Sequence, residues 1–384
     1  MSVFADLVGQ EDATRVLSQA AAGNGMTHAW LFVGPPGSGR SVAASAFAAA
    51  LQCPNGQGCG TCATCHTVNS GTHPDVQRII PEGLSIGVDE VRRIITTASR
   101  TPTSATWQIL IMEDADRLTE SAANALLKAI EEPPERTVFL LCAPSDNPQE
   151  LSITIRSRCR RVSLRQPPAE AIAALLQEKD GLASPEANLY AAAAQGHIGR
   201  ARRLATDDTA RAKRSDVLAI PRKLTSLSAC FTAAVEIIEA AEAEASDVNT
   251  DRSEAERESL ELALGKGGTG KGASKASRGS AGALKDLEKR QKTRDTRAQR
   301  DSLDRALVDL AAFYRDALVA GYGSPVATIH PDMADTSRAA AGKMSPESLL
   351  RRIDAVLQCR EAITRNVRPR IAVEALMTRL WTGN

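Results

Sequence analysis

Four cysteines in the first quarter of the chain have the spacing of a metal site. They follow the pattern C-x5-C-x2-C-x2-C and are Cys53, Cys59, Cys62 and Cys65. Four thiolates complete a tetrahedral shell around Zn²⁺ and leave no position for a catalytic water. The spacing predicts a structural zinc site, with His66 and His73 as bystanders. Four free thiols and a [4Fe–4S] cluster, which also uses C-x2-C-x2-C runs, are the alternatives.

A Gly-rich loop, GPPGSGRS at residues 34–41, has the form of a phosphate-binding loop. In such a loop, backbone N–H groups hold the phosphates, a lysine reaches the β- and γ-phosphates, and Ser/Thr binds Mg²⁺. The residues at the contacting positions are Gly34, Gly37, Gly39, Arg40 and Ser41. Arg40 stands where lysine is required, and its wide planar fork does not replace a slim ammonium. The alternative is a Gly-rich turn that binds nothing.

Two carboxylates, Glu113 and Asp114, follow the apolar run at residues 109–112. A nucleotide-hydrolysing site needs an Asp for Mg²⁺ and then a residue that orients the attacking water. Here Glu comes first, so each carboxylate reach is off by about one methylene, roughly 1.5 Å. In-line attack tolerates such misplacement poorly. Together with Arg40, this order predicts little ATP turnover and makes Mg²⁺–ATP a doubtful cofactor.

An arginine-rich segment, IRSRCRR at residues 155–161, carries the third candidate for chemistry. A guanidinium such as that of Arg158 can reach into the nucleotide site of a neighbouring subunit and stabilise the transferring phosphoryl group. Two other interpretations are a solvated basic patch and a contact to a DNA backbone. The spacing of the arginines does not choose among the three.

The elements that position these residues alternate along the first 165 residues. Apolar runs at 29–33, 107–112 and 137–142 predict strands, and residues 41–51 and 121–132 predict helices. Strands that alternate with helices indicate an α/β domain with a parallel sheet flanked by helices. Ligands of such sheets bind at the carboxyl ends of the strands, where the Gly-rich loop and the two acids fall.

The rest of the chain is predicted to be helical. Residues 166–208 predict a small helical lid, and residues 209–384 predict an all-α domain. Residues 245–300 have few large apolar side chains, so we expect a flexible low-complexity insertion there. The string GKGGTGK at 265–271 lacks a preceding strand and a following helix, and is not expected to bind phosphate.

Composition excludes several classes of protein. The formal net charge is +1 from 47 Lys+Arg and 46 Asp+Glu, so the chain is not a globally basic nucleic-acid binder. Aromatic residues make up 3%, too few for a surface on which bases stack. Neither a signal peptide nor a long apolar segment is evident, so the expected location is the cytoplasm, away from membranes.

Several motifs together resemble the AAA+ clamp-loader family of bacterial DNA polymerase III. They cover residues 4–10, 28–34, 71–75, 118–134, 157–159, 199–201 and 366–376. The resemblance implies an AAA+ domain, a lid and a helical collar, with Arg158 of the Ser-Arg-Cys motif as the trans-acting finger. It also implies that Arg200 belongs to the second nucleotide sensor of the lid. The four-Cys insertion is typical of the bacterial members of this family.

The departures from the family pattern imply a particular role. Hydrolysing subunits of the family keep Lys in the phosphate loop and the order Asp-Glu, whereas this chain has Arg40 and Glu113-Asp114. The resemblance therefore implies a stator without ATPase activity of its own, inside a DNA-directed DNA polymerase holoenzyme. Implied partners are the ATPase subunits, the delta subunit, the sliding clamp and primed DNA. The alternatives are an active ATPase subunit of the same complex, and an unrelated P-loop kinase or regulator.

Overall fold

The computed structural model describes residues 2–148, 150–264 and 273–383, and the chain divides into two compact units. The first, Met1–Ala205, holds the α/β domain together with the lid helices, and the second, Thr206–Asn384, is helical. Among the described helices, none has both the length and the apolar character needed to cross a bilayer.

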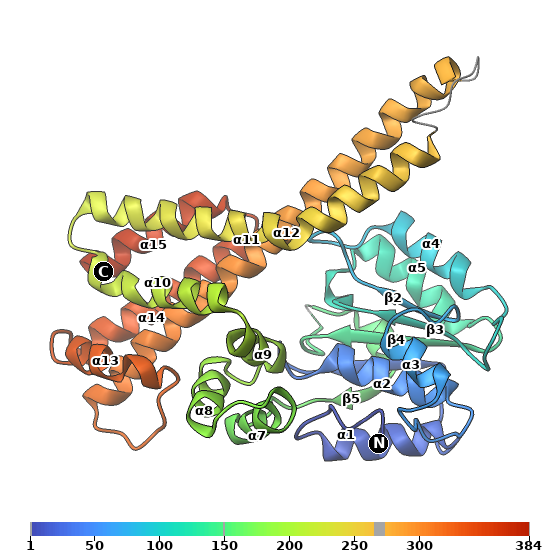
Figure 1. Cartoon of the computed structure of the whole chain (residues 1–384), viewed down its shortest axis with the longest axis horizontal. Helices are drawn as coiled ribbons and strands as arrows, with labels where there is room; N and C mark the ends of the chain where they lie inside the picture. Colours follow the sequence, from blue (N-terminus) through green and yellow to red (C-terminus); the bar gives the residue numbers. More distant parts are fainter. Residues whose placement is uncertain (1, 149, 265–272, 384) are drawn as a thin grey trace. The chain divides into compact units, whose positions relative to one another are not determined.

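A five-stranded parallel sheet forms the centre of the first unit (Figure 1), and its strand order is β2-β3-β4-β1-β5. The strands are β1 (Ala29–Val33), β2 (Val76–Ile79), β3 (Gln108–Met112), β4 (Thr137–Ala143) and β5 (Arg160–Ser163). The predicted strands β1, β3 and β4 are confirmed. They are the buried central strands, which explains their unbroken apolar sequences.

Helices cover both faces of this sheet. On one face, α1 (Glu11–Ala21), α2 (Arg40–Gln52) and α3 (Ala63–Asn69) share a core with alternate strand residues such as Trp30 and Phe32. On the other, α4 (Val88–Ala98), α5 (Glu120–Glu131) and α6 (Ile153–Arg158) pack with Leu31 and Leu141. The layers are those of an AAA+ domain, as predicted.

The lid helices of the first unit are α7 (Ala169–Asp180), α8 (Ser184–Ala193) and α9 (Ile198–Thr206). They enclose a small core of their own, which includes Ile172, Leu176, Ala187, Ala191 and Ala201. Lys179 of α7 forms an ion pair with Asp6 of the N-terminal segment. The lid therefore has its own packing and also contacts the segment that precedes the sheet.

The second unit consists of long helices around one apolar core. They are α10 (Asp208–Lys223), α11 (Leu227–Ala263), α12 (Ala273–Gly321), α13 (Ala334–Ala341), α14 (Pro346–Thr364) and α15 (Pro369–Thr382). Leu307, Leu310 and Phe313 of α12 are almost fully buried in this core, together with Val356 and Met377. The arrangement agrees with the collar expected from the family resemblance.

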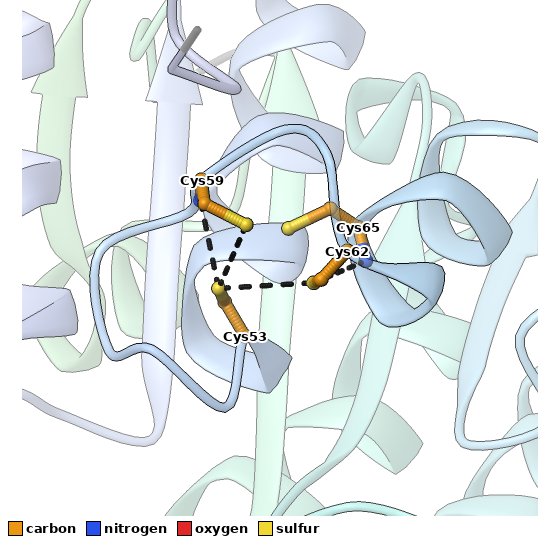
Figure 2. Close-up of side chains that lie close together, drawn as sticks. All are labelled: Cys53, Cys59, Cys62 and Cys65. Carbon is orange, nitrogen blue, oxygen red and sulfur yellow. Dashed lines mark hydrogen bonds between the residues drawn. The ribbon is translucent and has the colours of Figure 1, made fainter.

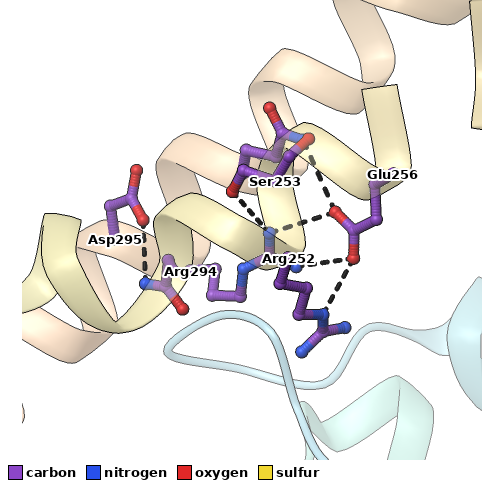
Figure 3. Close-up of polar contacts among 7 residues, drawn as sticks. Arg252, Ser253, Glu256, Arg294 and Asp295 are labelled. Carbon is purple, nitrogen blue, oxygen red and sulfur yellow. Dashed lines mark hydrogen bonds and ion pairs between the residues drawn. The ribbon is translucent and has the colours of Figure 1, made fainter. Parts of the chain in front are cut away.

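The far halves of α11 and α12 run side by side past the other helices of the second unit (Figure 1). Figure 3 shows how they are joined: buried Arg294 donates to both carboxylate oxygens of Glu256, at 2.9 and 3.0 Å, and to the Ser253 hydroxyl at 2.9 Å. The amide of Asn249 donates to Asp295 at 2.9 Å.

The described parts of residues 245–300 are thus helical, and the prediction of a flexible insertion is wrong for them. Composition misleads here because polar contacts between the two helices replace much of the apolar burial that ordering usually requires. The string at 265–271 lies outside the described residues.

A buried aspartate fixes the loop that leads into β3. Asp75, 2% exposed, accepts hydrogen bonds from the N–H and hydroxyl groups of Thr103 and Ser104 at 2.7–2.8 Å. Burial raises the pKa of this carboxyl, but the four donors outweigh it and lower the pKa to about 2. Asp75 therefore holds residues 103 and 104 against the start of β2.

We expect Asp75→Asn to lower the free energy of unfolding by about 2 kcal/mol at pH 7, as measured by urea denaturation. Because the folded pKa is lowered, this contribution is present above the unfolded value near 3.9 and is lost as pH falls toward 2. Asp89→Asn is the control, since Asp89 lies exposed on α4 and pairs only with exposed Arg92 in the described structure. Equal stability of wild type and Asp75→Asn across this pH range would contradict the assignment.

Candidate functional site

The Gly-rich loop connects the carboxyl end of β1 to the first turn of α2. Gly37 and Gly39 have φ angles of 85° and 89°, a conformation that residues with a Cβ rarely adopt. Gly39 directly precedes α2, and Ser41 lies in its first turn. The structure therefore places these residues in the strand–loop–helix geometry that binds phosphate at a helix N-terminus.

Arg40 is turned back onto the loop that carries it. Its Nη1 donates a hydrogen bond to the carbonyl oxygen of Gly34. The loop is packed tightly there, because a Cβ on Gly34 would lie 2.5 Å from the Ser38 hydroxyl and 2.6 Å from the Leu164 carbonyl oxygen. The guanidinium is thus bonded within the loop, whereas a lysine at this position would extend toward the phosphates.

A lid residue, His197, packs directly against the same loop. A Cβ on Gly37 would lie 2.5 Å from the Cα and 2.6 Å from the Cβ of His197. The backbone N–H of Arg200 donates to His197 Nδ1 at 3.2 Å, which holds the first turn of α9 at this place. The sequence indicated only a break between helices here, since the contact joins residues far apart in the chain.

Gln10 holds the Gly-rich loop in place through hydrogen bonds. Like His197, it is a residue whose role the sequence did not indicate. Its buried amide nitrogen donates to the carbonyl oxygens of Ser38, at 3.3 Å, and Arg165, at 2.5 Å. Its amide oxygen accepts from the N–H of Arg165 at 3.0 Å. Gln10 therefore joins the Gly-rich loop to the segment between β5 and the lid.

The two acids lie at the end of β3, on the same edge of the sheet as the loop. Glu113 forms an ion pair with Arg78, and Asp114 Oδ2 lies 3.6 Å from Arg117 Nε. Burial, and secondly the charge of Asp114, raise the pKa of Asp116 close by, a carboxyl that the sequence did not single out. Both acids of the predicted degenerate nucleotide site thus have arginine partners within the chain.

Arg158 lies at the opposite edge of the sheet. Arg158 is the last residue of α6 and precedes the amino end of β5, which runs parallel to β1. The Gly-rich loop follows the carboxyl end of β1, so the two lie at opposite ends of the strands. The side chain is 40% exposed, pairs with Glu131 and donates to the Thr154 carbonyl oxygen at 3.1 Å. The sheet therefore separates Arg158 from the Gly-rich loop of the same chain, and its exposed side chain is accessible to another molecule.

The four predicted cysteines converge at the end of α2 and the start of α3 (Figure 2). Their sulfur atoms all lie within 4.8 Å of one another, and Cys53 Sγ lies 3.8 Å from Cys59 Sγ and 4.0 Å from Cys62 Sγ. Four sulfurs at about 2.3 Å from a tetrahedral Zn²⁺ would be about 3.8 Å apart. A disulfide needs about 2.05 Å. The cluster therefore fits a zinc ion.

The surroundings of three of the sulfurs also suit metal ligands, whereas burial of Cys65 opposes the loss of its proton. The N–H groups of Cys59 and Cys65 approach Cys53 Sγ and Cys62 Sγ at 3.5 and 3.4 Å. Donors at Thr61 lower the pKa of Cys59 to about 5, whereas burial raises the pKa of Cys65 to about 12. His66 and His73 are not part of the cluster. Bound zinc would supply folding energy here, because four protein ligands leave no open position.

The parallel sheet, the Gly-rich loop at its carboxyl edge and the lid helices define an AAA+ protein. Residues 9–168 match the family model described as DNA polymerase III, delta subunit. The match covers less than half of the chain, and this part is similar to a subunit of DNA polymerase III.

Similar proteins bear related names. The chain is 37% identical to the tau subunit of DNA polymerase III from Bacillus subtilis over 44% of its own length and 30% of that protein. It is 32% identical to the delta′ subunit of Bacillus subtilis over 50% of its own length and 58% of that protein. It is 37% identical to the delta′ subunit of Escherichia coli over 41% of its own length and 48% of that protein. The chain thus spans between 30% and 58% of these relatives.

Among solved structures, a DNA polymerase III gamma-subunit-related protein from Thermotoga maritima aligns over 97% of this chain and 98% of its own. The two are 16% identical and have a TM-score of 0.44.

Proposed function

We propose that this chain is a stator subunit of the delta′ kind in a bacterial sliding-clamp loader. It hydrolyses no ATP itself and presents Arg158 to the nucleotide of the adjacent ATPase subunit. Its partners are the ATPase subunits and the delta subunit and, through the complex, the sliding clamp and primed DNA. Two curated relatives named delta′ support the choice of subunit.

The observation that carries the proposal is the state of the chain's own loop. Arg40 bonds the Gly34 carbonyl, and His197 packs on Gly37, so the cation of the loop is engaged within the loop and a lid residue lies against it. Phosphate binding needs free N–H groups and a cation that reaches the ligand. Arg158, in contrast, is accessible at the far edge of the sheet.

The direct test is an ATP titration of the isolated chain. We expect Arg40→Lys combined with His197→Ala to bind ATP at least about tenfold tighter than wild type, about 1.4 kcal/mol, because the substitutions free the loop carbonyl and remove the imidazole. Arg15→Lys is the control, since Arg15 is exposed on α1 and pairs with Asp12. Brisk hydrolysis of ATP by the isolated wild-type chain would favour an active ATPase subunit and refute the stator.

A further inference from the structure

The paired far halves of α11 and α12 carry opposite charges. Residues 242–264 contain eight Asp+Glu and two Arg, whereas residues 273–300 contain nine Lys+Arg and three Asp+Glu. Part of this charge is used where the helices meet, as in the contact between Arg294 and Glu256. Neither the sheet domain nor the family motifs account for this hairpin.

The face of α12 that meets α11 is defined by its contacts. Leu287 is buried, Gln291 donates to the Ser253 carbonyl oxygen at 2.9 Å, and Arg294 bonds Glu256. These three positions are spaced by four and three residues, so they form one line along the helix. The opposite side of α12 must therefore face away from α11.

That opposite side carries a line of cations, here called the basic stripe: Lys285, Lys289 and Lys292. Each lysine precedes a contact position by two residues, which places it about 200° around the helix. All three side chains are exposed, and among the described residues none of them forms an ion pair. Glu288, three residues after Lys285 and four before Lys292, is exposed on the same side of the helix, so the stripe holds three cations and one acid.

We propose that the basic stripe of α12 binds the phosphate backbone of double-stranded DNA. Cations on one exposed helix face gain affinity from a polyanion by releasing its condensed counterions. Residues 245–300 contain no aromatic side chain that could stack on a base, so the contact is independent of sequence and favours the duplex, where phosphate charge is densest. The choice of DNA as the polyanion rests on the proposed function.

A second copy of the chain is a less suitable occupant. The outer face of α11 carries the exposed acids Asp247, Asp251, Glu254 and Glu258, which could pair with the basic stripe of a second copy. Exposed ion pairs of this kind contribute little. The acids do not repel DNA either, because about 20 Å of hairpin separates the two outer faces, more than a Debye length of about 8 Å.

The test measures binding of the full-length chain to a labelled duplex by fluorescence anisotropy over a series of salt concentrations. We expect Lys285→Gln, Lys289→Gln and Lys292→Gln together to weaken binding at low salt at least about tenfold. The slope of log K against log salt should become less steep by up to about 2.7, since each phosphate contact contributes about 0.9. Circular dichroism confirms that the variant keeps its helical content.

Two control variants make the result specific. Lys285→Arg, Lys289→Arg and Lys292→Arg together should keep the affinity, and Asp251→Asn with Glu254→Gln and Glu258→Gln should not weaken it. Unchanged affinity and slope in the glutamine variant would overturn the proposal, as would a dimer in sedimentation that both charge-removing variants dissociate. ATP turnover of the loader without DNA should be unaffected, so failure here differs from failure of the stator proposal.

Discussion

Arg158→Ala is expected to lower ATP turnover of the reconstituted clamp loader about 10³-fold while the complex still assembles. An arginine supplied by a neighbouring subunit stabilises charge on the transferring phosphoryl group, and its loss typically costs at least this much. Assembly should be spared because the side chain is 40% exposed and the described structure joins it to one residue of another helix, Glu131. Steady-state ATPase rates and gel filtration of the same preparation measure the two effects.

Two variants separate this role from a general effect of charge. Arg161→Ala removes another exposed arginine, one that pairs with Asp146, and should leave turnover near wild type. Glu131→Ala releases Arg158 from its partner and should preserve turnover, since the finger must leave Glu131 to reach a phosphate. If Arg158→Ala hydrolyses ATP as fast as wild type in the complete loader, this chain supplies no finger.

How far the sequence predicts this fold depends on where each strand lies. The central strands β1, β3 and β4 are covered on both faces, so their apolar runs identified them. The edge strands β2 and β5 have the sequences VQRI and RRVS, in which charged residues face solvent. Edge strands tolerate polar residues, so β5 has no apolar run that would identify it as a strand. In the sequence it therefore resembled a basic segment.

The paired far halves of α11 and α12 show the limit of composition. Residues 245–300 have few large apolar residues, but Arg294 bonds both Glu256 and Ser253 across the two helices. Hydrogen bonds from Arg294, opposed by burial, lower the pKa of Glu256 to about 2, so the pair stays charged above that pH. Contacts between residues about forty positions apart leave no periodic signal that a composition argument detects.

At the Gly-rich loop and the two acids that follow β3, the sequence identified the residues of the candidate site but not the residues that they contact. The departure at Arg40 follows from the motif alone, because the loop demands lysine at that position. The contacts of Gln10 with Ser38 and of His197 with Gly37 depend on how the first residues and the lid return to the loop. Such contacts follow from tertiary packing, which a single sequence does not encode as a local pattern.

Loss of the zinc ligands should have the largest effect on stability. Cys53→Ser with Cys62→Ser is expected to abolish the single zinc per chain and to unfold the segment between α2 and α3. Metal binding to four thiolates contributes roughly 10–16 kcal/mol in small zinc domains, so the Gly-rich segment is expected to lose its folded conformation when the metal is lost. Metal analysis and limited proteolysis of residues 53–65 provide the measurements.

Acid should have a similar effect, because only thiolates bind zinc and falling pH protonates them. Cys159→Ser is the control, since Cys159 is a thiol outside the cluster and should leave the zinc content at one per chain. The sulfur spacing alone fits zinc, but metal analysis also tests the iron–sulfur alternative. Iron with acid-labile sulfide, or a metal-free chain that resists proteolysis as well as the wild type, would contradict a structural zinc site.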